Sequence, residues 1–487
     1  MSMPLLTDLT DLPADVIRPG YDRDGLGTGI LHLGLGAFHR AHQAVYTDDA
    51  LAAEGGDWRI LGANLRSTEM PQAMTAQNGL YSLLERSESD RLRVIGAHGH
   101  KAIGGDAAAI LKAASDPAIR ILSLTVSEKA YGIDRAAMDI DEAHPAVAAD
   151  LARPDAPQGV LGIITAALAA RHAAGHAPFT VLCCDNLPDN GTLLRAGVLG
   201  MARRHDPDLA ARIADQVAFP ATMVDRITPA VTDRTLSDVE RLTGHRDLAA
   251  VETEPFTQWV IEDHFPEGRP AWEAGGAEFV TDVSAHEAMK LRMLNGSHSL
   301  IAYLGQMLGL RYVRDLVADR ALSALVLRHM RAAGTTLPRN AGLDAPSYAE
   351  ALMDRFRNPA IAHETRQIAM DGTEKLPQRW FSPAADLLSS GGDPRAYAFA
   401  TAVWLGWLSE LAAKGEQPND PRAARLMQLV SQAGSDATAL TASVLSLPGL
   451  APDALVWDEG FTGATSRTLA RIRAEGLRAV LATELAG

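Results

Sequence analysis

Cysteine is almost absent from this sequence, which has only Cys183 and Cys184 among its 487 residues. Two adjacent cysteines cannot build a multi-disulfide framework, and they lack the spacing of zinc ligands. The N-terminus has no basic segment ahead of an apolar core, so it is not expected to be a signal peptide. The longest apolar run, residues 160–170, is too short to cross a bilayer. We therefore expect a cytoplasmic protein without a bound metal and without a membrane partner.

An excess of basic charge is also missing. The chain has 45 Lys and Arg against 60 Asp and Glu, which gives a net charge of −15 at pH 7. Nucleic-acid binding usually requires a dense basic surface, so no nucleic-acid partner is expected. The content of 47% hydrophobic and 22% charged residues is that of an ordinary globular protein. A small-molecule ligand remains compatible, including an anionic one held by a few local cations.

Short apolar segments alternate with helical patterns in the first part of the chain. This alternation is typical of βαβ units around a parallel sheet. After about residue 284, helical patterns dominate. The sequence thus predicts an α/β domain over residues 1–283 and a mostly α-helical domain over residues 284–487. The expected strands are 30–33, 58–62, 119–126 and 179–184, and the expected helices are 37–54, 106–115, 161–174, 285–308, 311–333, 348–356, 397–414, 421–433 and 466–485.

A glycine turn follows the first expected strand, with Gly34 and Gly36 at the mouth of a helix. Glycine at these points allows a pyrophosphate to approach the backbone, as in Rossmann-type dinucleotide-binding domains. His39 replaces the third glycine of the usual fingerprint, so a plain strand–helix turn is the alternative. The polar entry to the helix, His39, Arg40 and His42, is either a solvated first turn or, for Arg40, an anion contact. The dinucleotide interpretation assigns cofactor contacts to Gly34, Leu35, Gly36, Ala37, Phe38 and Arg66.

The residues after the second expected strand should contact the adenosine ribose. Asp or Glu at this point is typical of NAD enzymes, whereas Arg suits the 2′-phosphate of NADP. Here the segment 64–67 contains Arg66, and Glu69 follows slightly later. Because Arg66 is either a surface residue or a phosphate contact, these residues leave the choice between NAD and NADP open.

A second group of polar residues lies near the start of the helical part. Residues 284–287 (SAHE) fit a capping box with Ser as the helix cap. In an ideal α-helix, Asn295 would lie about 140° and His298 about 80° around the axis from Lys290, over about 12 Å. The three side chains would line an extended substrate, or converge if Gly296 breaks the helix.

The chemistry of these three side chains suits hydride transfer to a carbonyl. A lysine partly buried beside polar groups can have a lowered pKa and act as an acid or base near neutrality. Asn and His can donate hydrogen bonds to a carbonyl oxygen or to hydroxyls without a metal. The structural alternative is a helix with an exposed Lys290, a packed His298 and a capping Asn295.

The spacing Lys290-x4-Asn295-x2-His298 resembles the signature of the polyol-specific long-chain dehydrogenase/reductase family, also called the mannitol dehydrogenase family. The resemblance implies an oxidoreductase with a Rossmann-type domain, a helical domain and a nicotinamide cofactor. The supporting stretches are GLGAFHRAH (34–42), TVSEKAYG (125–132), CDNLPDNG (184–191), FPATMVDRITP (219–229), EPFTQWVIED (254–263) and NPAIAHETRQIAMDGTEKLPQR (358–379).

The resemblance also implies roles for individual residues. Lys290 would be the general acid/base. Asn186 and Asn295 would hold the reacting oxygen, and His298 would bind a neighbouring hydroxyl. Glu287 would help to conduct the proton to solvent. The implied substrate contacts are Asp225, Lys375 and an arginine that is either Arg366 or is replaced by Gln367.

Several of these assignments have structural alternatives. Asn186 would otherwise cap a turn. Asp225 would pair with Arg226 or Arg234 at the surface, and Lys375 would be a solvated loop residue.

Two details resemble the hexuronate reductases within this family. Lys129 follows Glu128, where mannitol-type members tend to have glycine, and the helix reads NGSHSLIAYLG (295–305). A lysine at the carboxyl edge of a strand suits the carboxylate of a uronate, whereas an ion pair with Glu128 or Asp134 is the alternative. The resemblance implies NAD-dependent interconversion of D-fructuronate and D-mannonate, with NADP not excluded.

Other interpretations stay open. A mannitol 2-dehydrogenase-type enzyme would interconvert a hexitol and fructose, and a tagaturonate reductase would use the related uronate. A dinucleotide sensor without catalysis belongs to a different class, but it would be expected to lack the proton-transfer lysine. The expected partner is a small sugar acid or polyol, and the chain is expected to be a monomer or a small homo-oligomer.

Overall fold

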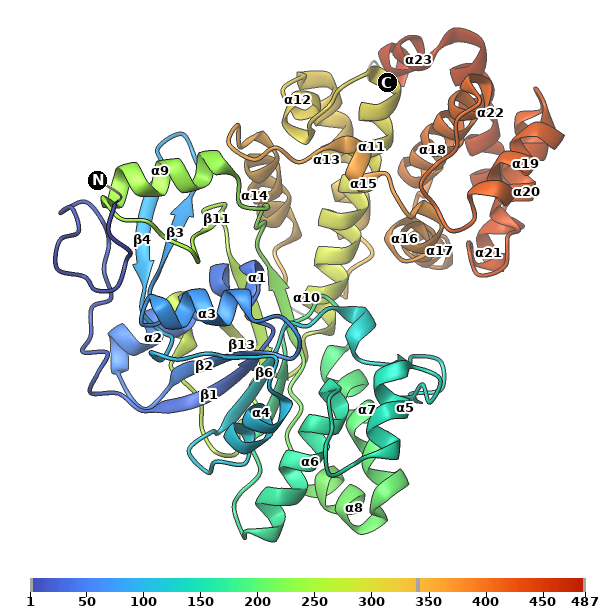
Figure 1. The fold of residues 1–487 in the computed structure, drawn as a ribbon. Helices are drawn as coiled ribbons and strands as arrows, with labels where there is room; N and C mark the ends of the chain where they lie inside the picture. Colours follow the sequence, from blue (N-terminus) through green and yellow to red (C-terminus); the bar gives the residue numbers. More distant parts are fainter. Residues whose placement is uncertain (1–2, 339–341, 485–487) are drawn as a thin grey trace. The chain divides into compact units, whose positions relative to one another are not determined.

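The computed structural model describes residues 3–338 and 342–484 (Figure 1). The contacts divide the chain into two compact units, Met1–Ser284 and Ala285–Gly487. They are called unit 1 and unit 2 below, and each is described by itself. In the described residues, no helix has both the length and the apolar character needed to cross a membrane.

A five-stranded parallel sheet forms the centre of unit 1. Its strand order is β5–β2–β1–β6–β9, and Figure 1 shows β1, β2 and β6 side by side. β1 and β6 pair in register from Ile30 beside Ile121 to Leu33 beside Leu124. The predicted parallel sheet is therefore confirmed. The bounds are β1 Thr28–Leu33, β2 Arg59–Asn64, β5 Ile103–Gly104, β6 Ile121–Leu124 and β9 Thr180–Cys183.

The strands of this sheet are apolar on both faces because both faces are covered. Successive side chains of a strand point to opposite faces. Leu31 and Leu33 accordingly belong to a core with residues of α4, α6 and α7, whereas Ile30 belongs to a core with residues of α1 and α2. A parallel sheet buried on both faces reads as continuous apolar runs, which is why its strands could be predicted. The bounds are α1 Ala37–Ala41, α2 Gln43–Glu54, α4 Ala107–Ala114, α6 Val160–Ala173 and α7 Asn190–His205.

The single helix expected over residues 37–54 is in fact two helices. The chain bends at His42 (φ −124°, ψ −93°), between α1 and α2. His42 is buried, and its Nε2 lies 2.9 Å from the carbonyl oxygen of Gln258. This contact anchors the bend.

Unit 1 also has three smaller sheets that the sequence did not predict. Their strands have only two to five residues, too few for an alternating pattern to stand out. The strand orders are β11–β3–β4, β10–β12–β13 and β7–β8. The bounds are β3 Tyr81–Glu85, β4 Arg91–Ile95, β7 Ile133–Asp134, β8 Asp139–Ile140, β10 Thr222–Asp225, β11 Val251–Thr253, β12 Gln258–Glu262 and β13 Glu278–Val280, with helices α3 Glu69–Ala76, α5 Pro145–Ala152, α8 Pro207–Gln216 and α9 Asp233–Thr243 and short turns η1 Glu128–Ala130 and η2 Trp272–Gly275.

Unit 2 is helical, as predicted. Its helices enclose one large apolar core that contains Tyr303, Trp380, Tyr397 and Trp404. Two of its segments, η3 and η4, are π-helices rather than α-helices. The bounds are α10 Ser284–Met289, η3 Lys290–Asn295, α11 Gly296–Leu308, α12 Val313–Val317, α13 Arg320–Gly334, α14 Ala345–Arg357, α15 Thr365–Ile368, α16 Gly372–Leu376, η4 Pro377–Phe381, α17 Ser382–Ser389, α18 Arg395–Lys414, α19 Ala423–Ala433, α20 Ala437–Leu445, α21 Asp453–Val456, α22 Glu459–Glu475 and α23 Leu477–Glu484.

Candidate active site

The glycine turn after β1 is held in a conformation that requires glycine at its first position. Gly34 has φ +103°, and a Cβ at this position would collide with the carbonyl oxygen of Thr125. The backbone N–H of Leu35 donates to Oδ1 of Asn64 at 2.7 Å, which ties the turn to the end of β2. The turn is therefore fixed before any ligand binds.

A stack of histidines occupies the place of the missing third glycine. The ring of His39 lies parallel to that of His32 in β1, with centroids 3.4 Å apart and planes 12° apart. His39 Nδ1 lies 3.1 Å from Oε1 of Gln43, and its Nε2 lies 3.3 Å from Nε2 of His98. Flat stacking lets α1 approach β1 closely, which is what the glycine of the usual fingerprint achieves.

The interpretation of residues 39–42 as a solvated turn is wrong, because His39, Arg40 and His42 are all buried. Burial lowers the pKa of His39 well below its usual range, and the nearby His32, His98 and Arg40 lower it further. Arg40 Nη1 lies 2.9 Å from the sulfur of Met70, and the same arginine lines the cavity described next.

A cavity of about 890 Å³ opens beside the glycine turn. Among the predicted cofactor residues, it is lined by Gly34, Leu35, Gly36, Ala37 and Arg66. Phe38 is not part of its lining; the Phe38 ring stacks on His42, with centroids 5.0 Å apart. The cavity has the size of a ligand site and lies at the carboxyl ends of the parallel strands, where open α/β sheets bind ligands.

Lys129 also lines this cavity, from the turn η1 that follows β6. The lysine is exposed, and its backbone carbonyl oxygen lies 3.0 Å from Nε2 of His144. The predicted carboxylate contact thus borders the predicted cofactor site. The alternative pairing with Glu128 involves a side chain outside the described part of the structure.

Asn186 and Asp225 lie near the carboxyl ends of two strands in unit 1. Asn186 is exposed shortly after β9, and Asp225 is the last residue of β10 and is buried. Burial excludes a surface ion pair for Asp225. Arg226 pairs instead with Glu85 at 2.7 Å. In the same region the backbone N–H of Val126 donates to Oδ2 of Asp185 at 2.9 Å.

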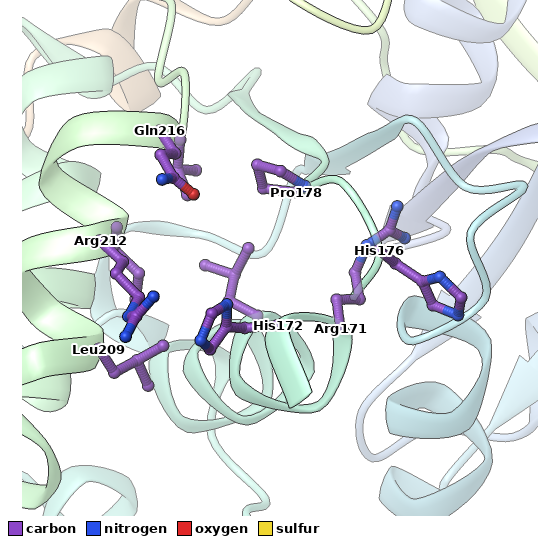
Figure 2. Close-up of a pocket in the computed structure, with 10 residues that line it drawn as sticks. Arg171, His172, His176, Pro178, Leu209, Arg212 and Gln216 are labelled. Carbon is purple, nitrogen blue, oxygen red and sulfur yellow. The ribbon is translucent and has the colours of Figure 1, made fainter. Parts of the chain in front are cut away.

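A second cavity in unit 1, of about 30 Å³, lies near the other end of α6. Figure 2 shows His172 and Arg212 at its wall. The neighbouring Arg171 guanidinium donates to the carbonyl oxygens of Asp116 and Ile119, at 2.7 and 2.9 Å. The cavity has room for about one or two waters, and its buried arginine is used by the protein itself. It is not the substrate site.

In unit 2, the segment that carries Lys290 and Asn295 is a π-helix. The angles expected from an ideal α-helix are therefore wrong for this segment. Gly296 has helical dihedral angles (φ −61°, ψ −46°), so it does not break the helix. Ser284 is the first residue of α10 rather than its cap, and its N–H donates to Oδ1 of Asp282 at 2.8 Å. Single π-helical turns inside α-helices occur frequently at functional sites.

The second π-helix, η4, supplies hydrogen bonds to the first. Arg379 Nη1 donates to the carbonyl oxygen of Asn295 at 3.2 Å and to Oγ of Ser299 at 3.0 Å. Trp380 Nε1 donates to the carbonyl oxygen of Gly296 at 2.9 Å. A π-turn interrupts the regular backbone ladder, and carbonyl groups freed in a buried helix need other donors. The side chains of η4 supply such donors at the junction of η3 and α11.

Lys290 and His298 are buried in unit 2, with exposed fractions of 9% and 7%. The interpretation of Lys290 as an exposed surface lysine is therefore wrong. His298 Nε2 has no hydrogen-bond partner in the described part of the chain, and the ring packs on Phe356 with centroids 4.6 Å apart. Burial lowers the pKa of His298 well below its usual range, and nearby positive charges lower it further. A neutral imidazole with an unused nitrogen can bind a hydroxyl, but it is a poor acid near pH 7.

Lys375 and Glu287 are partly buried in unit 2. Lys375 Nζ donates to the carbonyl oxygen of Met370 at 2.7 Å and lies 3.8 Å from Oδ2 of Asp371. Burial lowers the pKa of Lys375, and the charge of Arg379 lowers it further. Lys375 is therefore anchored rather than a freely solvated loop residue.

Two arginines that no motif of the sequence singled out lie near His298. Arg366 and Gln367 are exposed on α15, and Arg366 lines a separate cavity of about 400 Å³. Arg355 and Arg379 are instead the arginines whose positive charge lowers the pKa of His298. The sequence block 358–379 includes Arg379, but nothing in its spacing connects this residue to Asn295. Within the described residues, no group of three His, Cys, Asp or Glu side chains is arranged to hold a metal ion.

A parallel sheet with a glycine turn at its ligand-binding edge is the arrangement of Rossmann-type dinucleotide-binding proteins, the class to which unit 1 belongs. The chain belongs to the mannitol dehydrogenase family: residues 28–274 match the mannitol dehydrogenase Rossmann domain, and residues 282–454 match the mannitol dehydrogenase C-terminal domain. It is thus an oxidoreductase of a family that acts on CH–OH groups.

Curated relatives of the chain span both sugar acids and polyols. The D-mannonate oxidoreductase of Escherichia coli (strain K12) is 40% identical, over 98% of this chain and 100% of that protein. A mannitol 2-dehydrogenase of Cereibacter sphaeroides is 42% identical, over 83% of this chain and 86% of that protein. Among solved structures, the ternary complex of Pseudomonas fluorescens mannitol 2-dehydrogenase with NAD and D-mannitol matches with a TM-score of 0.82 and 35% identity, over 100% of this chain and 99% of that one.

Proposed function

We propose that the protein is an NAD-dependent reductase that interconverts D-fructuronate and D-mannonate. The observation that carries the proposal is the buried Lys290 on a π-helical turn, with the neutral, partly unpartnered His298 eight residues further on. The near full-length similarity to a D-mannonate oxidoreductase supports the choice of substrate. Two free, buried cysteines support the cytoplasmic location that belongs to this proposal.

The cavity beside the glycine turn fits a nicotinamide dinucleotide. A side chain at Gly34 would collide with the backbone, and the first N–H groups of α1 have no intrahelical partners to satisfy them. The volume of about 890 Å³ is sufficient for a large ligand. When bound in reduced form, the dinucleotide would supply a hydride to the keto carbon of the substrate.

The residues of unit 2 would manage the proton and the developing charge. As the carbonyl carbon accepts the hydride, the ammonium group of Lys290 gives its proton to the oxygen, which becomes the new hydroxyl. Asn295 donates a hydrogen bond to that oxygen while its charge develops. His298 Nε2 binds a neighbouring hydroxyl, and Glu287 passes a proton from solvent back to Lys290. The reverse oxidation uses Lys290 as the base. The same oxygen-binding role for Asn186, and substrate contacts for Asp225 and Lys375, remain predictions.

A mannitol-type polyol dehydrogenase is the second candidate, because solved and curated relatives carry that name. A uronate differs from a polyol by its carboxylate, so charge separates the two candidates. Lys129 is the cation proposed to contact that carboxylate, and Arg366 is exposed beside a different cavity. A tagaturonate reductase would share the charge and differ in stereochemistry.

A substrate panel tests the proposal. Purified protein is assayed with D-fructuronate, D-tagaturonate and D-fructose, and oxidation of the reduced nicotinamide is followed by absorbance at increasing substrate concentration. The largest kcat/KM is expected for fructuronate. A larger value for fructose would move the assignment to the polyol dehydrogenases, and binding of reduced NAD without turnover of any substrate would favour a sensor.

The Lys129→Gly variant tests the carboxylate contact in the same assay. A charge-assisted hydrogen bond contributes about 1.5–3 kcal/mol, so kcat/KM for fructuronate should fall about tenfold to hundredfold. The value for fructose, which has no carboxylate, should change little. Equal losses on both substrates would assign Lys129 a structural role or a role toward the cofactor.

A further inference from the structure

The end of β2, where the adenosine ribose of a dinucleotide is expected, carries no carboxylate of its own. β2 ends at Asn64, and Asn64 is already used by the protein. Its Oδ1 accepts from the N–H of Leu35 at 2.7 Å, and its Nδ2 donates to Oγ of Ser67 at 2.8 Å. The side chain in the position usual for a ribose-binding Asp or Glu therefore fixes the glycine turn instead.

Two donors follow Asn64 and face the same cavity. Arg66 and Ser67 are both exposed, and both line the cavity beside the glycine turn. Arg66 has no ion pair or hydrogen bond from its guanidinium among the described residues. Because Ser67 Oγ accepts its hydrogen bond from Asn64, its own hydroxyl proton is available to a ligand. A guanidinium beside a hydroxyl is a donor set for phosphate oxygens.

The charge of the whole cavity lining also favours binding of a phosphate. Arg40, Arg66 and Lys129 line it, and among the described residues no Asp or Glu does. Glu69 begins α3 just beyond, but it is exposed and lies outside the lining. This is a local cationic surface on a chain with a net charge of −15. The lining therefore offers no carboxylate to a ribose diol, whereas it offers the cationic donors that a phosphate dianion needs.

We propose that Arg66 and Ser67 bind the 2′-phosphate of NADP(H), so that the protein binds NADPH at least as tightly as NADH. This inference rests on the proposed function and extends its cofactor at that same site from NAD alone to NAD and NADP. The guanidinium of Arg66 and the hydroxyl of Ser67 would donate hydrogen bonds to the phosphate oxygens. Asn64 keeps the turn in place in either complex.

Equilibrium binding tests this proposal without turnover. The purified full chain is titrated with NADPH and NADH by nicotinamide fluorescence, and with 2′,5′-ADP and 5′-ADP by calorimetry. The Kd for NADPH is expected to be equal to or lower than that for NADH, and 2′,5′-ADP should bind more tightly than 5′-ADP. Salt should weaken the binding of NADPH more steeply than that of NADH, because an exposed ion pair is screened.

Variants at the end of β2 locate the effect. Arg66→Ala should raise the Kd for NADPH about tenfold or more, as expected for loss of a charge-assisted hydrogen bond, and change the Kd for NADH less than about threefold. Arg66→Lys should keep part of the NADPH affinity, since it retains the charge without the fork. The control is Arg212→Ala, an exposed arginine at the small cavity near the other end of α6. It should leave both Kd values unchanged.

The possible failures are distinguishable. A wild-type protein that binds NADH more tightly than NADPH overturns this inference and leaves the proposed function intact. The inference also fails if Arg66→Ala raises the Kd for NADPH and the Kd for NADH by the same factor, because the arginine would then not contact the 2′-phosphate. A protein that binds neither dinucleotide contradicts the proposed function itself.

Discussion

The two units prepare their candidate sites in different ways. In unit 1 the backbone is decisive: a glycine with φ +103° turns beside Thr125, and the Asn64 side chain holds the next residue. In unit 2 the side chains are decisive, because Lys290 and Asn295 lie on a π-helix. At its end, the carbonyl oxygens of Asn295 and of the next residue, Gly296, accept from Arg379 and Trp380.

This difference separates recognition from chemistry. A phosphate-bearing cofactor can be bound by main-chain N–H groups and a few surface cations, which many sequences can supply. Proton transfer requires one particular functional group at one position, held to within a fraction of an ångström. Substitutions at the glycine turn of unit 1 should therefore change dinucleotide affinity, and substitutions around η3 should change turnover at unchanged dinucleotide affinity.

The largest effect is expected for Lys290→Ala. Loss of a general acid typically costs about 10²–10⁴-fold, so kcat should fall by at least about a hundredfold. The Kd for reduced dinucleotide, measured by fluorescence, should stay the same. Lys414→Ala is the matched control, because Lys414 is an exposed lysine at the end of α18. Near-normal turnover of Lys290→Ala would contradict the proton-transfer role.

The second largest effect is expected for Gly34→Ala, in the glycine turn of unit 1. The added Cβ would meet the Thr125 carbonyl oxygen in a backbone conformation that suits glycine. We expect the Kd for reduced dinucleotide to rise about tenfold or more, since the turn must shift by a fraction of an ångström or more. Circular dichroism checks that the protein is folded.

Gly55→Ala is the control for Gly34→Ala. Gly55 has φ +68°, and a Cβ there would have nothing within 4 Å. This variant carries the backbone strain without the steric clash. If Gly55→Ala weakened dinucleotide binding as much as Gly34→Ala, general destabilisation rather than the turn would explain both.

The sequence predicted those features that depend on local patterns. The strands around Leu31 and Leu122 are buried on both faces and read as apolar runs, and Gly34 sits where the turn needs it. The π-helix at 290–295 was not predictable, because its residues keep the composition of an ordinary amphipathic helix. A hydrogen bond at its end comes from Arg379, 84 residues away, and such a long-range contact leaves no local signal.

The histidine stack was missed for a related reason. His39 and His42 are polar residues in the first turn of a helix, which suggests solvent exposure. Both are buried because β1 and β12 supply partners, the ring of His32 and the carbonyl oxygen of Gln258. Polar residues at the start of a helix therefore suggested exposure wrongly, because their buried partners are distant in sequence.

A smaller effect is expected for Arg379→Met, which tests the contact between the two π-helices. Arg379 positions η3 by donating to the carbonyl oxygen of Asn295. Burial lowers its pKa to about 10, so it remains charged near neutrality. We expect kcat to fall about tenfold while the Kd for reduced dinucleotide stays unchanged, because a small displacement of catalytic groups slows chemistry selectively.

Two further variants keep the Arg379 test specific. Arg379→Lys retains a donor and should restore part of kcat. Arg467→Met, which removes an exposed arginine of α22, should leave kcat unchanged. A loss of dinucleotide affinity equal to the loss of kcat in Arg379→Met would mean a general structural defect rather than positioning of η3.

The last prediction concerns the buried histidines of both units and the pH dependence of the unfolding free energy. Their effect is the smallest of those predicted at neutral pH and increases in acid. Burial lowers the pKa of His98 in unit 1 well below its usual range and that of His329 in unit 2 to about 3. The unfolded chain binds a proton at each near pH 6.5, and the folded chain does not. The contribution of these histidines to stability is therefore complete above about pH 6.5. It falls as pH decreases, by about 1.4 kcal/mol per pH unit for each histidine.

His98→Gln and His329→Gln should each reduce the slope of unfolding free energy against pH by about that amount between pH 6 and 5, measured by urea denaturation. His205→Gln, at an exposed position, should leave the slope unchanged. A slope that is the same in all three variants would contradict the lowered pKa values of His98 and His329, because it would show that these rings take up protons while the chain is folded.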